Sequence, residues 1–292
     1  MLALLVPMAM LWALTVWAVL SLALSTTLKT AAIFAALRRR PVQDRLPSPD
    51  PLPRVSILVA LFHERDIAGR LVRRLSRLDY PRESLEILLV VERNDHETQA
   101  ALRKSVLPAW MRVVIAPDGA LLTKPRALNH ALKMCRGEIV GVYDAEDAPE
   151  PDQIRRVVRR FANRGPRVAC LQGVLDFYNP RTNWLSRCFT MEYASWFRII
   201  LPGMERLGLP IPLGGTTLFF RRKALEELGA WDACNVTEDA DLGIRLSRHG
   251  YRTELIDTTT FEEANCRPLP WIRQRSRWLK GYFMTYAVHM RD

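Results

Sequence analysis

The longest apolar run of the chain lies at its amino end, where residues 2–28 contain no charged side chain. At about 1.5 Å of rise per residue, a helix of this length crosses a hydrocarbon core of about 30 Å. The run lacks a basic leading segment and is longer than the apolar part of a signal peptide, so it predicts a retained transmembrane helix. Lys29 and three arginines at residues 38–40 follow. Because basic flanks stay inside, we expect the rest of the chain on the cytoplasmic side of the cell (inner) membrane.

Beyond this run, short apolar stretches alternate with amphipathic ones. Residues 41–53 contain five prolines and predict an extended linker. The pattern then predicts strands over 55–60, 85–91, 112–115 and 139–143, and helices over 67–78, 97–107, 125–135 and 153–164. This β-α-β-α order is typical of an α/β fold with a doubly wound, mostly parallel sheet. Ligands of such sheets bind beyond the carboxyl ends of the strands.

After residue 175 the order is less regular. A long helix is predicted over 184–201, a loop rich in glycine and proline over 208–215, a strand over 216–221, a helix over 240–249 and a strand over 252–257. The pattern contains no internal repeat and no low-complexity tract.

The composition limits the classes of binding partner that we expect. A net charge of +11 suits nucleic acid, anionic lipid headgroups or phosphorylated substrates. Arg155, Arg156, Arg159 and Arg160 form a basic helical stripe, which we interpret as a solvated or lipid-facing surface. No nucleic-acid-binding motif accompanies it, so no nucleic acid partner is expected. Five cysteines without C-x-x-C spacing argue against a disulfide framework or a zinc site and favour a reducing compartment.

Three acids follow the predicted strand 139–143 within four residues: Asp144, Glu146 and Asp147. They repel one another unless a cation lies among them, and Mg²⁺ or Mn²⁺ takes such oxygen ligands together with a substrate diphosphate. A solvated acidic turn is the equally weighted alternative.

A second acidic group, Thr237-Glu238-Asp239, stands just before a predicted helix. Thr237 or Asp239 can cap that helix, and acids are stabilised at a helix amino end. A carboxylate held there is also rigid enough to act as a general base toward an acceptor hydroxyl.

The third feature is the run from Gln274 to Trp278. On a helix, Gln274, Arg277 and Trp278 share one face. Arginine binds phosphate oxygens, and tryptophan offers a flat surface to a sugar ring. A basic amphipathic helix lying on the membrane explains the same residues, and the two interpretations are compatible on different faces.

Together these residues resemble the membrane-bound family 2 glycosyltransferases, the cellulose-synthase-like group. Four motifs occur in order from Val55 to the carboxyl end: Ala60-Leu61-Phe62-His63-Glu64, Asp144-Ala145-Glu146 at the D-x-D position, Thr237-Glu238-Asp239 at T-E-D, and Gln274 with Arg277-Trp278 at Q-x-x-R-W. One such tripeptide is weak evidence, whereas four in order behind a membrane helix are specific.

The resemblance implies a GT-A fold and an inverting, metal-dependent hexosyltransferase. Asp239, with Glu238 beside it, would be catalytic, and Asp239 would deprotonate the acceptor hydroxyl. Asp144 and Glu146 would hold Mg²⁺ or Mn²⁺ on the donor diphosphate, with Asp147 as the alternative second ligand.

Further donor contacts are implied. Ala60, Glu64 and Glu92 would lie near the nucleoside and Lys124 near the phosphates. Gln274 and Arg277 would neutralise the leaving diphosphate, Trp278 would meet the acceptor, and the loop Gly214–Thr217 would lie beside it. In place of the family's D-D-G the chain has Glu92-Arg93-Asn94-Asp95.

The expected organisation follows from these assignments. Residues 1–40 form the transmembrane helix and basic flank, 41–53 the linker, 54–175 the nucleotide-sugar-binding half, 176–270 the acceptor and catalytic half, and 271–292 an amphipathic interfacial helix.

The expected function is transfer of a sugar, from UDP by family precedent, to a glycan or polysaccharide acceptor at the bilayer. The alternative is a non-catalytic nucleotide-sugar-binding subunit of a membrane polysaccharide-synthesis complex. This alternative is considered because family members continue into further membrane helices, whereas this sequence ends about fourteen residues after Trp278. Other membrane subunits are then expected partners.

Overall fold

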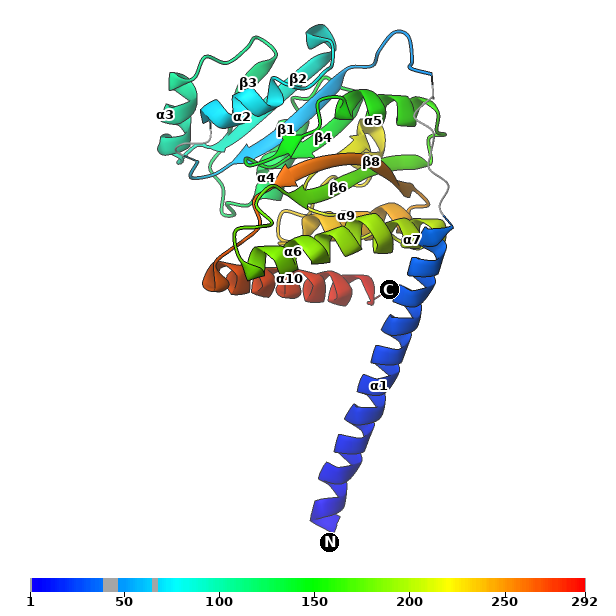
Figure 1. Cartoon of the computed structure of the whole chain (residues 1–292). Helices are drawn as coiled ribbons and strands as arrows, with labels where there is room; N and C mark the ends of the chain where they lie inside the picture. The colour runs from blue at the N-terminus through cyan, green and yellow to red at the C-terminus, as the bar shows by residue number, and fades with distance from the viewer. Residues whose placement is uncertain (1, 39–46, 65–67, 292) are drawn as a thin grey trace.

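The computed structural model describes residues 2–38, 47–64 and 68–291. Residues 39–46, which include two of the flanking arginines and the first part of the predicted linker, lie outside the described residues. Leu2–Leu37 form one helix, α1, of which Pro7–Leu37 are long and apolar enough to cross a membrane by length and composition. Figure 1 shows α1 projecting away from the rest of the molecule.

The base of α1 is fixed to the α/β domain at α7 (Leu201–Arg206). Ala32 is fully buried there. A Cβ built on Gly203 would lie 2.0 Å from the Ala32 carbonyl oxygen, so only glycine permits this approach of the two backbones. The contact fixes where the apolar helix leaves the α/β domain.

An eight-stranded sheet forms the centre, in the order β3-β2-β1-β4-β7-β6-β8-β5. Its strands are β1 Val55–Leu61, β2 Leu85–Glu92, β3 Met111–Ala116, β4 Ile139–Tyr143, β5 Ala148–Pro149, β6 Val168–Phe177, β7 Leu218–Arg221 and β8 Arg252–Glu262. The first four strands in this order run parallel, β7 is antiparallel to both of its neighbours, and β6 and β8 run parallel to each other. The predicted α/β, mostly parallel sheet is confirmed.

Helices cover both faces of the sheet. They are α2 Ala68–Leu75, α3 His96–Lys104, α4 Lys124–Leu132, α5 Gln153–Ala162, α6 Trp184–Ser195, α8 Arg222–Glu227, α9 Glu238–Arg248 and α10 Pro268–His289, with a short 3-10 turn η1 at Arg82–Ser84. Two large apolar clusters lie on the two faces of the sheet. Because β1 and β2 are buried on both faces, their sequences are almost continuously apolar.

Several details differ from the sequence-based expectation. Helix α3 ends at Lys104 rather than near 107, since Ser105 is extended and Pro108 disfavours helix in the residue before it. Residues 184–206 are not one helix: a π-helical turn at Trp196–Ile200 separates α6 from α7. Strand β6 was not anticipated, and β8 continues five residues beyond 257.

Candidate active site

The acidic loop after β4 lies at the carboxyl edge of the sheet. Asp144 follows the last residue of β4, and its Oδ1 accepts a hydrogen bond of 2.5 Å from Lys124 Nζ, at the start of α4. Lys124 Nζ also donates to the Gly215 carbonyl oxygen at 2.8 Å. Burial acts to lower the pKa of Lys124, but the nearby carboxylates of Asp144, Glu238 and Asp239 outweigh it and raise that pKa. Lys124 is therefore a permanent cation at the centre of the site.

Asp147 points into the fold rather than toward the open side of this loop. It is fully buried, and its Oδ2 accepts hydrogen bonds from the Asp144 backbone N–H, at 2.8 Å, and from the Thr216 hydroxyl. Burial and the charge of Asp144 raise its pKa well above the usual value. Asp147 thus fixes the loop conformation, and Glu146 is the partly exposed acid beside Asp144.

The amino end of α9 brings a second pair of acids to the same place. Thr237 is the N-cap residue by position, but its side chain makes no capping hydrogen bond. A Cβ built on Gly215 would lie 3.6 Å from Asp239 Oδ2 and 4.0 Å from Lys124 Nζ, so Asp239 lies close to the lysine. Burial and the charge of Glu238 raise the pKa of Asp239 to about 7. Such a group exchanges a proton near neutral pH, as a general base must.

Glu262 is a site residue that the sequence reasoning missed. It ends β8, and one of its carboxylate oxygens is buried with no hydrogen-bond partner in the described part of the chain. Burial, followed by the charges of Asp147, Asp144 and Glu146, raises its pKa well above the usual value. The run of β-branched residues 258–260 signalled that the strand continues, which would have placed Glu262 at the carboxyl edge.

Six carboxyl groups therefore lie in this region: Asp144, Glu146, Asp147, Glu238, Asp239 and Glu262. All but Asp147 interact electrostatically with Lys124, which is partly buried. Within the described ranges, no three His, Cys, Asp or Glu side chains are arranged as a metal centre. The donor set is nevertheless carboxylate oxygen, which Mg²⁺ and Mn²⁺ prefer, and Mg²⁺ sites often combine one or two carboxylates with substrate phosphates. The unpartnered oxygen of Glu262 adds an acceptor with no hydrogen-bond donor. The residues fit a hard divalent cation.

The three predicted residues of α10 have different surroundings. Gln274 Oε1 accepts a hydrogen bond of 3.1 Å from Asn265, in the segment after β8. Trp278 packs in an aromatic cluster with Phe189 of α6, at 6.2 Å between ring centroids. Arg277 is exposed, and its charge acts on Glu238, so it lies on the side of the acids. On α10, Arg277 therefore lies on the side of the acids, whereas Trp278 packs against α6.

The residues expected near the nucleoside lie at the ends of β1 and β2. Ala60 is the penultimate residue of β1, partly buried against the core. Glu64 follows β1, its backbone N–H donates to Thr98 Oγ1 at 2.8 Å, and burial raises its pKa. Glu92 is buried and forms an ion pair with Arg126. Glu92 is thus neutralised inside the protein, whereas Glu64 is more open.

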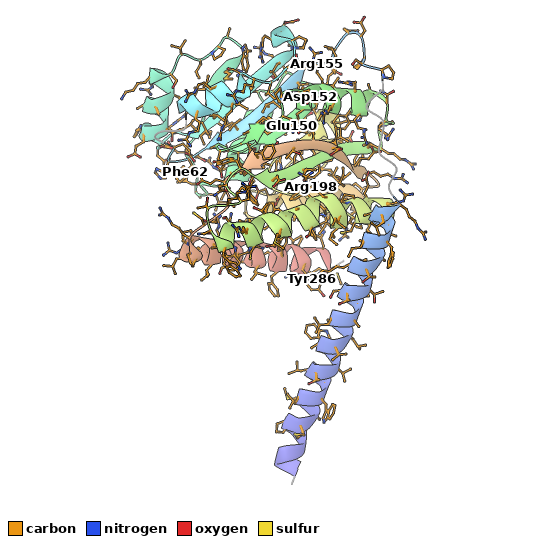
Figure 2. The ribbon with its side chains drawn as sticks, viewed as in Figure 1. Phe62, Glu150, Asp152, Arg155, Arg198 and Tyr286 are labelled. Atoms are coloured by element: carbon orange, nitrogen blue, oxygen red, sulfur yellow. The ribbon has the colours of Figure 1, made fainter. Side chains whose placement is uncertain are left out.

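The basic stripe on α5 is compensated within the fold. Arg155 pairs with Asp79, Arg156 with Asp152 and Glu150, and Arg160 with Glu254. Figure 2 labels Glu150, Asp152 and Arg155 on α5 and the segment that precedes it, on the side of the sheet opposite α10. These pairs account for three of the four arginines, so the stripe is not an open cationic surface.

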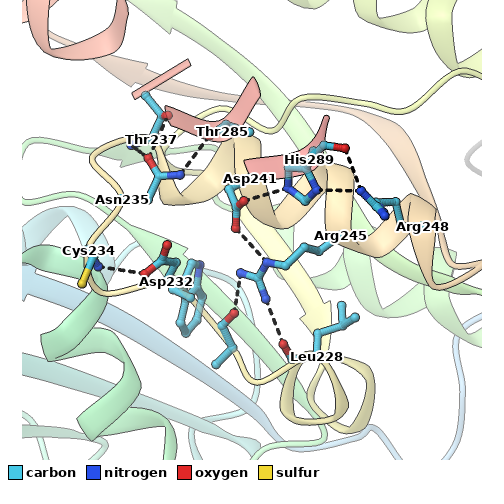
Figure 3. A network of polar contacts seen from close by, with 12 residues as sticks. Leu228, Asp232, Cys234, Asn235, Thr237, Asp241, Arg245, Arg248, Thr285 and His289 are labelled. Carbon is cyan, nitrogen blue, oxygen red and sulfur yellow. Dashed lines mark hydrogen bonds and ion pairs between the residues drawn. The ribbon is translucent and has the colours of Figure 1, made fainter. Parts of the chain in front are cut away.

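A separate polar network joins α9 to the end of α10 (Figure 3). Asp241 is buried and accepts a hydrogen bond of 2.7 Å from Arg245 Nε, while His289 Nε2 lies 2.9 Å from its other oxygen. Arg245 also donates to the carbonyl oxygens of Leu228 and Ala230, at 2.8 and 2.7 Å. One turn earlier, the Asn235 amide donates to Thr285 at 2.8 Å. The catalytic candidates at the start of α9 are thereby held against α10.

The sequence comparison identifies the class of protein. A profile described as "Glycosyltransferase like family 2" matches residues 53–281, which is most of the chain, and the chain belongs to that family. It is 32% identical over 249 residues to a beta-monoglucosyldiacylglycerol synthase of Synechocystis sp., covering 82% of this chain and 50% of that protein. It is 27% identical to a probable glucomannan 4-beta-mannosyltransferase 1 of Arabidopsis thaliana, covering 80% of this chain and 43% of that protein. The chain thus spans about half the length of these relatives.

A solved structure shows the same fold. The mannosyltransferase PcManGT from Pyrobaculum calidifontis, in complex with GDP-Man and Mn²⁺, superimposes with a TM-score of 0.68 at 22% identity, covering 93% of this chain and 75% of that one. The predicted GT-A-type fold of a family 2 glycosyltransferase is therefore confirmed.

Proposed function

We propose that this chain is an inverting glycosyltransferase that moves a sugar from a nucleotide sugar to a glycan or polysaccharide acceptor at the cytoplasmic face of the inner membrane. The observation that carries the proposal is the position of Asp239. Its carboxyl group lies close to the Lys124 ammonium, and its pKa is raised to about 7. A group with that pKa is ionised often enough to accept a proton and basic enough to hold it.

The chemistry divides among the residues as follows. Asp144 and Glu146 would hold Mg²⁺ or Mn²⁺, which would supply positive charge to the donor diphosphate. Lys124 and Arg277 add positive charge where the leaving diphosphate gains negative charge. Asp239 takes the proton of the acceptor hydroxyl as the oxygen attacks the anomeric carbon from the side opposite the diphosphate. Because the attack is in line, the configuration at that carbon inverts.

The donor side is the end of β1 and β2, with Ala60, Glu64 and Glu92 near the nucleoside. UDP is the proposed nucleotide on family precedent, and the GDP-Man complex of the Pyrobaculum relative makes GDP the comparison to include. Gln274 supports the leaving-group side and Trp278 the acceptor side.

The membrane placement rests on exposed apolar side chains of α10 and α6. On α10, Ile272, Leu279, Phe283 and Tyr286 recur at helical spacing on one face, and all are at least half exposed, as is the C-cap residue Met290. Trp184 and Met191 of α6 are also exposed, and α6 lies beside α10 through the Arg275–Glu192 ion pair. Figure 1 shows both helices on the side from which α1 projects, and Figure 2 labels Tyr286 on α10. We propose that α1 spans the bilayer and that α10 lies in its interface.

A glycolipid acceptor is the second candidate. The start of α9 packs directly on α10, because a Cβ built on Gly281 would lie 2.4 Å from Thr237 Oγ1. Asp239 therefore lies about one helix diameter, roughly 10 Å, from the apolar surface. The Synechocystis relative is named for a glucosyldiacylglycerol product, which matches an acceptor hydroxyl at the membrane surface.

The test is sugar transfer by the full chain reconstituted alone in lipid vesicles, with UDP- and GDP-sugars and with Mn²⁺ or Mg²⁺. We expect turnover of one donor, abolished by chelation and by Asp144→Asn, and unaffected by Asp257→Asn, an exposed acid of β8. Vesicles with and without diacylglycerol separate the lipid acceptor from a soluble oligosaccharide. If the chain binds a nucleotide sugar but transfers nothing under any of these conditions, the non-catalytic subunit replaces the enzyme as the explanation.

A further inference from the structure

A cavity lies at the edge of the sheet opposite the candidate active site. Four neighbouring parallel strands each contribute one arginine at or near their amino ends: Arg112 on β3, Arg82 before β2, Arg54 before β1 and Arg136 before β4. All four line one cavity of about 390 Å³, which is within the size range of small-molecule sites. Strands of seven or eight residues separate it from the carboxyl edge by about 25 Å.

Two of these arginines are held in place by the protein. Arg112 Nη2 donates to the Met134 carbonyl oxygen at 2.6 Å and lies 3.6 Å from Glu86 Oε2. The Arg82 guanidinium stacks over Trp110, 4.4 Å from the ring centroid, and its Nη2 donates to the Ser76 carbonyl oxygen at 2.9 Å. Its Nη1 is buried and has no hydrogen-bond partner among the described residues. These contacts fix two of the four guanidinium groups at the pocket before any ligand arrives.

The other two arginines carry charge that the described residues do not balance. Arg54 and Arg136 are exposed, and neither guanidinium has a hydrogen bond or ion pair within the part of the chain that the structure describes. Glu86 cannot serve both, because its Oε1 already accepts from Ser56 Oγ and the Arg136 backbone N–H, each at 2.5 Å. With Glu83 as the second acid of the lining, four cations face two anions.

We propose that this cavity, here called the arginine pocket, binds a small soluble phosphorylated metabolite carrying at least two negative charges. An excess of two positive charges matches a phosphate dianion, and guanidinium groups bind phosphate oxygens in pairs. The pocket volume of about 390 Å³ favours a small molecule over a polymer. Figure 1 shows the chain entering β1 at the end of the sheet remote from α10, which favours a soluble ligand over a lipid headgroup.

The probe is inorganic pyrophosphate, titrated into the detergent-solubilised full chain in EDTA, with binding measured by calorimetry and thermal shift. We expect saturable binding that persists in Asp144→Asn, whose donor site is impaired. The double variant Arg54→Gln/Arg136→Gln should weaken binding at least about tenfold, since each guanidinium supplies charge-assisted hydrogen bonds. The matched control Arg187→Gln/Arg252→Gln removes the same charge at exposed positions elsewhere and should bind like the parent chain.

Two results overturn the proposal. Unchanged binding in the pocket double variant places the anion elsewhere, and an equal loss in both double variants shows a general charge effect. Both pocket substitutions are at exposed positions, and circular dichroism verifies the fold. If the double variant unfolds, Arg54→Gln and Arg136→Gln are titrated separately against the same control, with the same criterion. Neither result bears on sugar transfer, because the assay uses no donor, acceptor or metal.

Discussion

Helix α9 carries two aspartates, two positions apart, in opposite electrostatic situations. Asp239 faces the acidic cluster, close to Glu238, and its pKa is raised to about 7. Asp241 faces the network of Figure 3, where Arg245 and His289 each contact one of its oxygens. Burial and then the charge of Glu238 raise the pKa of Asp239, whereas Asp241 is buried with Arg245 and His289 as its partners. An incompletely compensated carboxylate costs stability and is available for chemistry, whereas a fully paired one holds elements together.

The largest expected effect is on turnover. Asp239→Asn keeps the shape of the side chain and removes the base, so kcat should fall by about 10²- to 10⁴-fold. Donor binding should remain, because Asp239 is not assigned to the metal or the nucleotide. The measurement is transfer of labelled sugar by the reconstituted chain, with Asp257→Asn as the matched control. Turnover within a fewfold of the parent chain would remove Asp239 from the mechanism.

The structural role of Asp241 is tested by the substitution Arg245→Ala. The substitution leaves Asp241 buried with His289 alone and frees the carbonyl oxygens of Leu228 and Ala230. Removing one partner of a buried ion pair costs about 3–5 kcal/mol, which should appear as a large fall in Tm of the solubilised protein. Lys223→Ala is the control, since its pair with Glu227 spans 3.9 Å and its side chain is 91% exposed. That control should change the free energy of unfolding by less than about 0.5 kcal/mol. Equal Tm values for the two variants would contradict the structural role.

The next prediction concerns the pH dependence of kcat/KM, which follows the ionisation of Asp239. Asp239 must be ionised to act as a base, and its raised pKa places that ionisation at about 7. Below this value, kcat/KM should fall about tenfold per pH unit, because kcat/KM reports the pKa of the free enzyme. The profile is measured between pH 5 and 9 at saturating metal. An acidic limb near pH 4, the usual range of aspartate, would show that the cluster does not perturb Asp239.

The sequence predicted the first half of the sheet well because its signals are local. Strands β1, β2 and β4 are buried on both faces, so their apolar runs stand out, and turn residues separate them from amphipathic helices. Strand β6 was missed although most of its residues are apolar. It crosses the predicted division at residue 175, and Gln172 and Gly173 interrupt the pattern while lying buried in the structure. Pairing of β4 with β7 joins the two predicted halves into one sheet, a long-range contact that no local pattern contains.

Sequence patterns also failed to predict the long-range contacts of the candidate site. The motif residues lie where the carboxyl ends of the strands meet, as expected of parallel sheets. The sequence did not show that Asp147 points inward to Thr216, that Glu92 is paired with Arg126, or that Trp278 packs on Phe189. Those outcomes depend on which side chains approach from distant segments. Glu262 was missed for a simpler reason, because β8 was ended five residues too early.

The smallest expected effect is a gain in stability from the same Asp239→Asn substitution. Between pH 4 and 7, folded Asp239 keeps a proton that the unfolded chain has lost, so stability falls as pH rises through this window. Above pH 7 the folded state carries the full cost of an ionised carboxylate among its neighbours, and asparagine removes that cost. We expect Tm at pH 8 to rise by roughly 2–8 °C, equivalent to about 1–2 kcal/mol, with little change at pH 4. The measurement is thermal unfolding of both proteins at the two pH values in the same detergent. A lower Tm for the variant at pH 8 would mean that Asp239 is compensated like Asp241, and the contrast between the two sides of α9 would then be wrong.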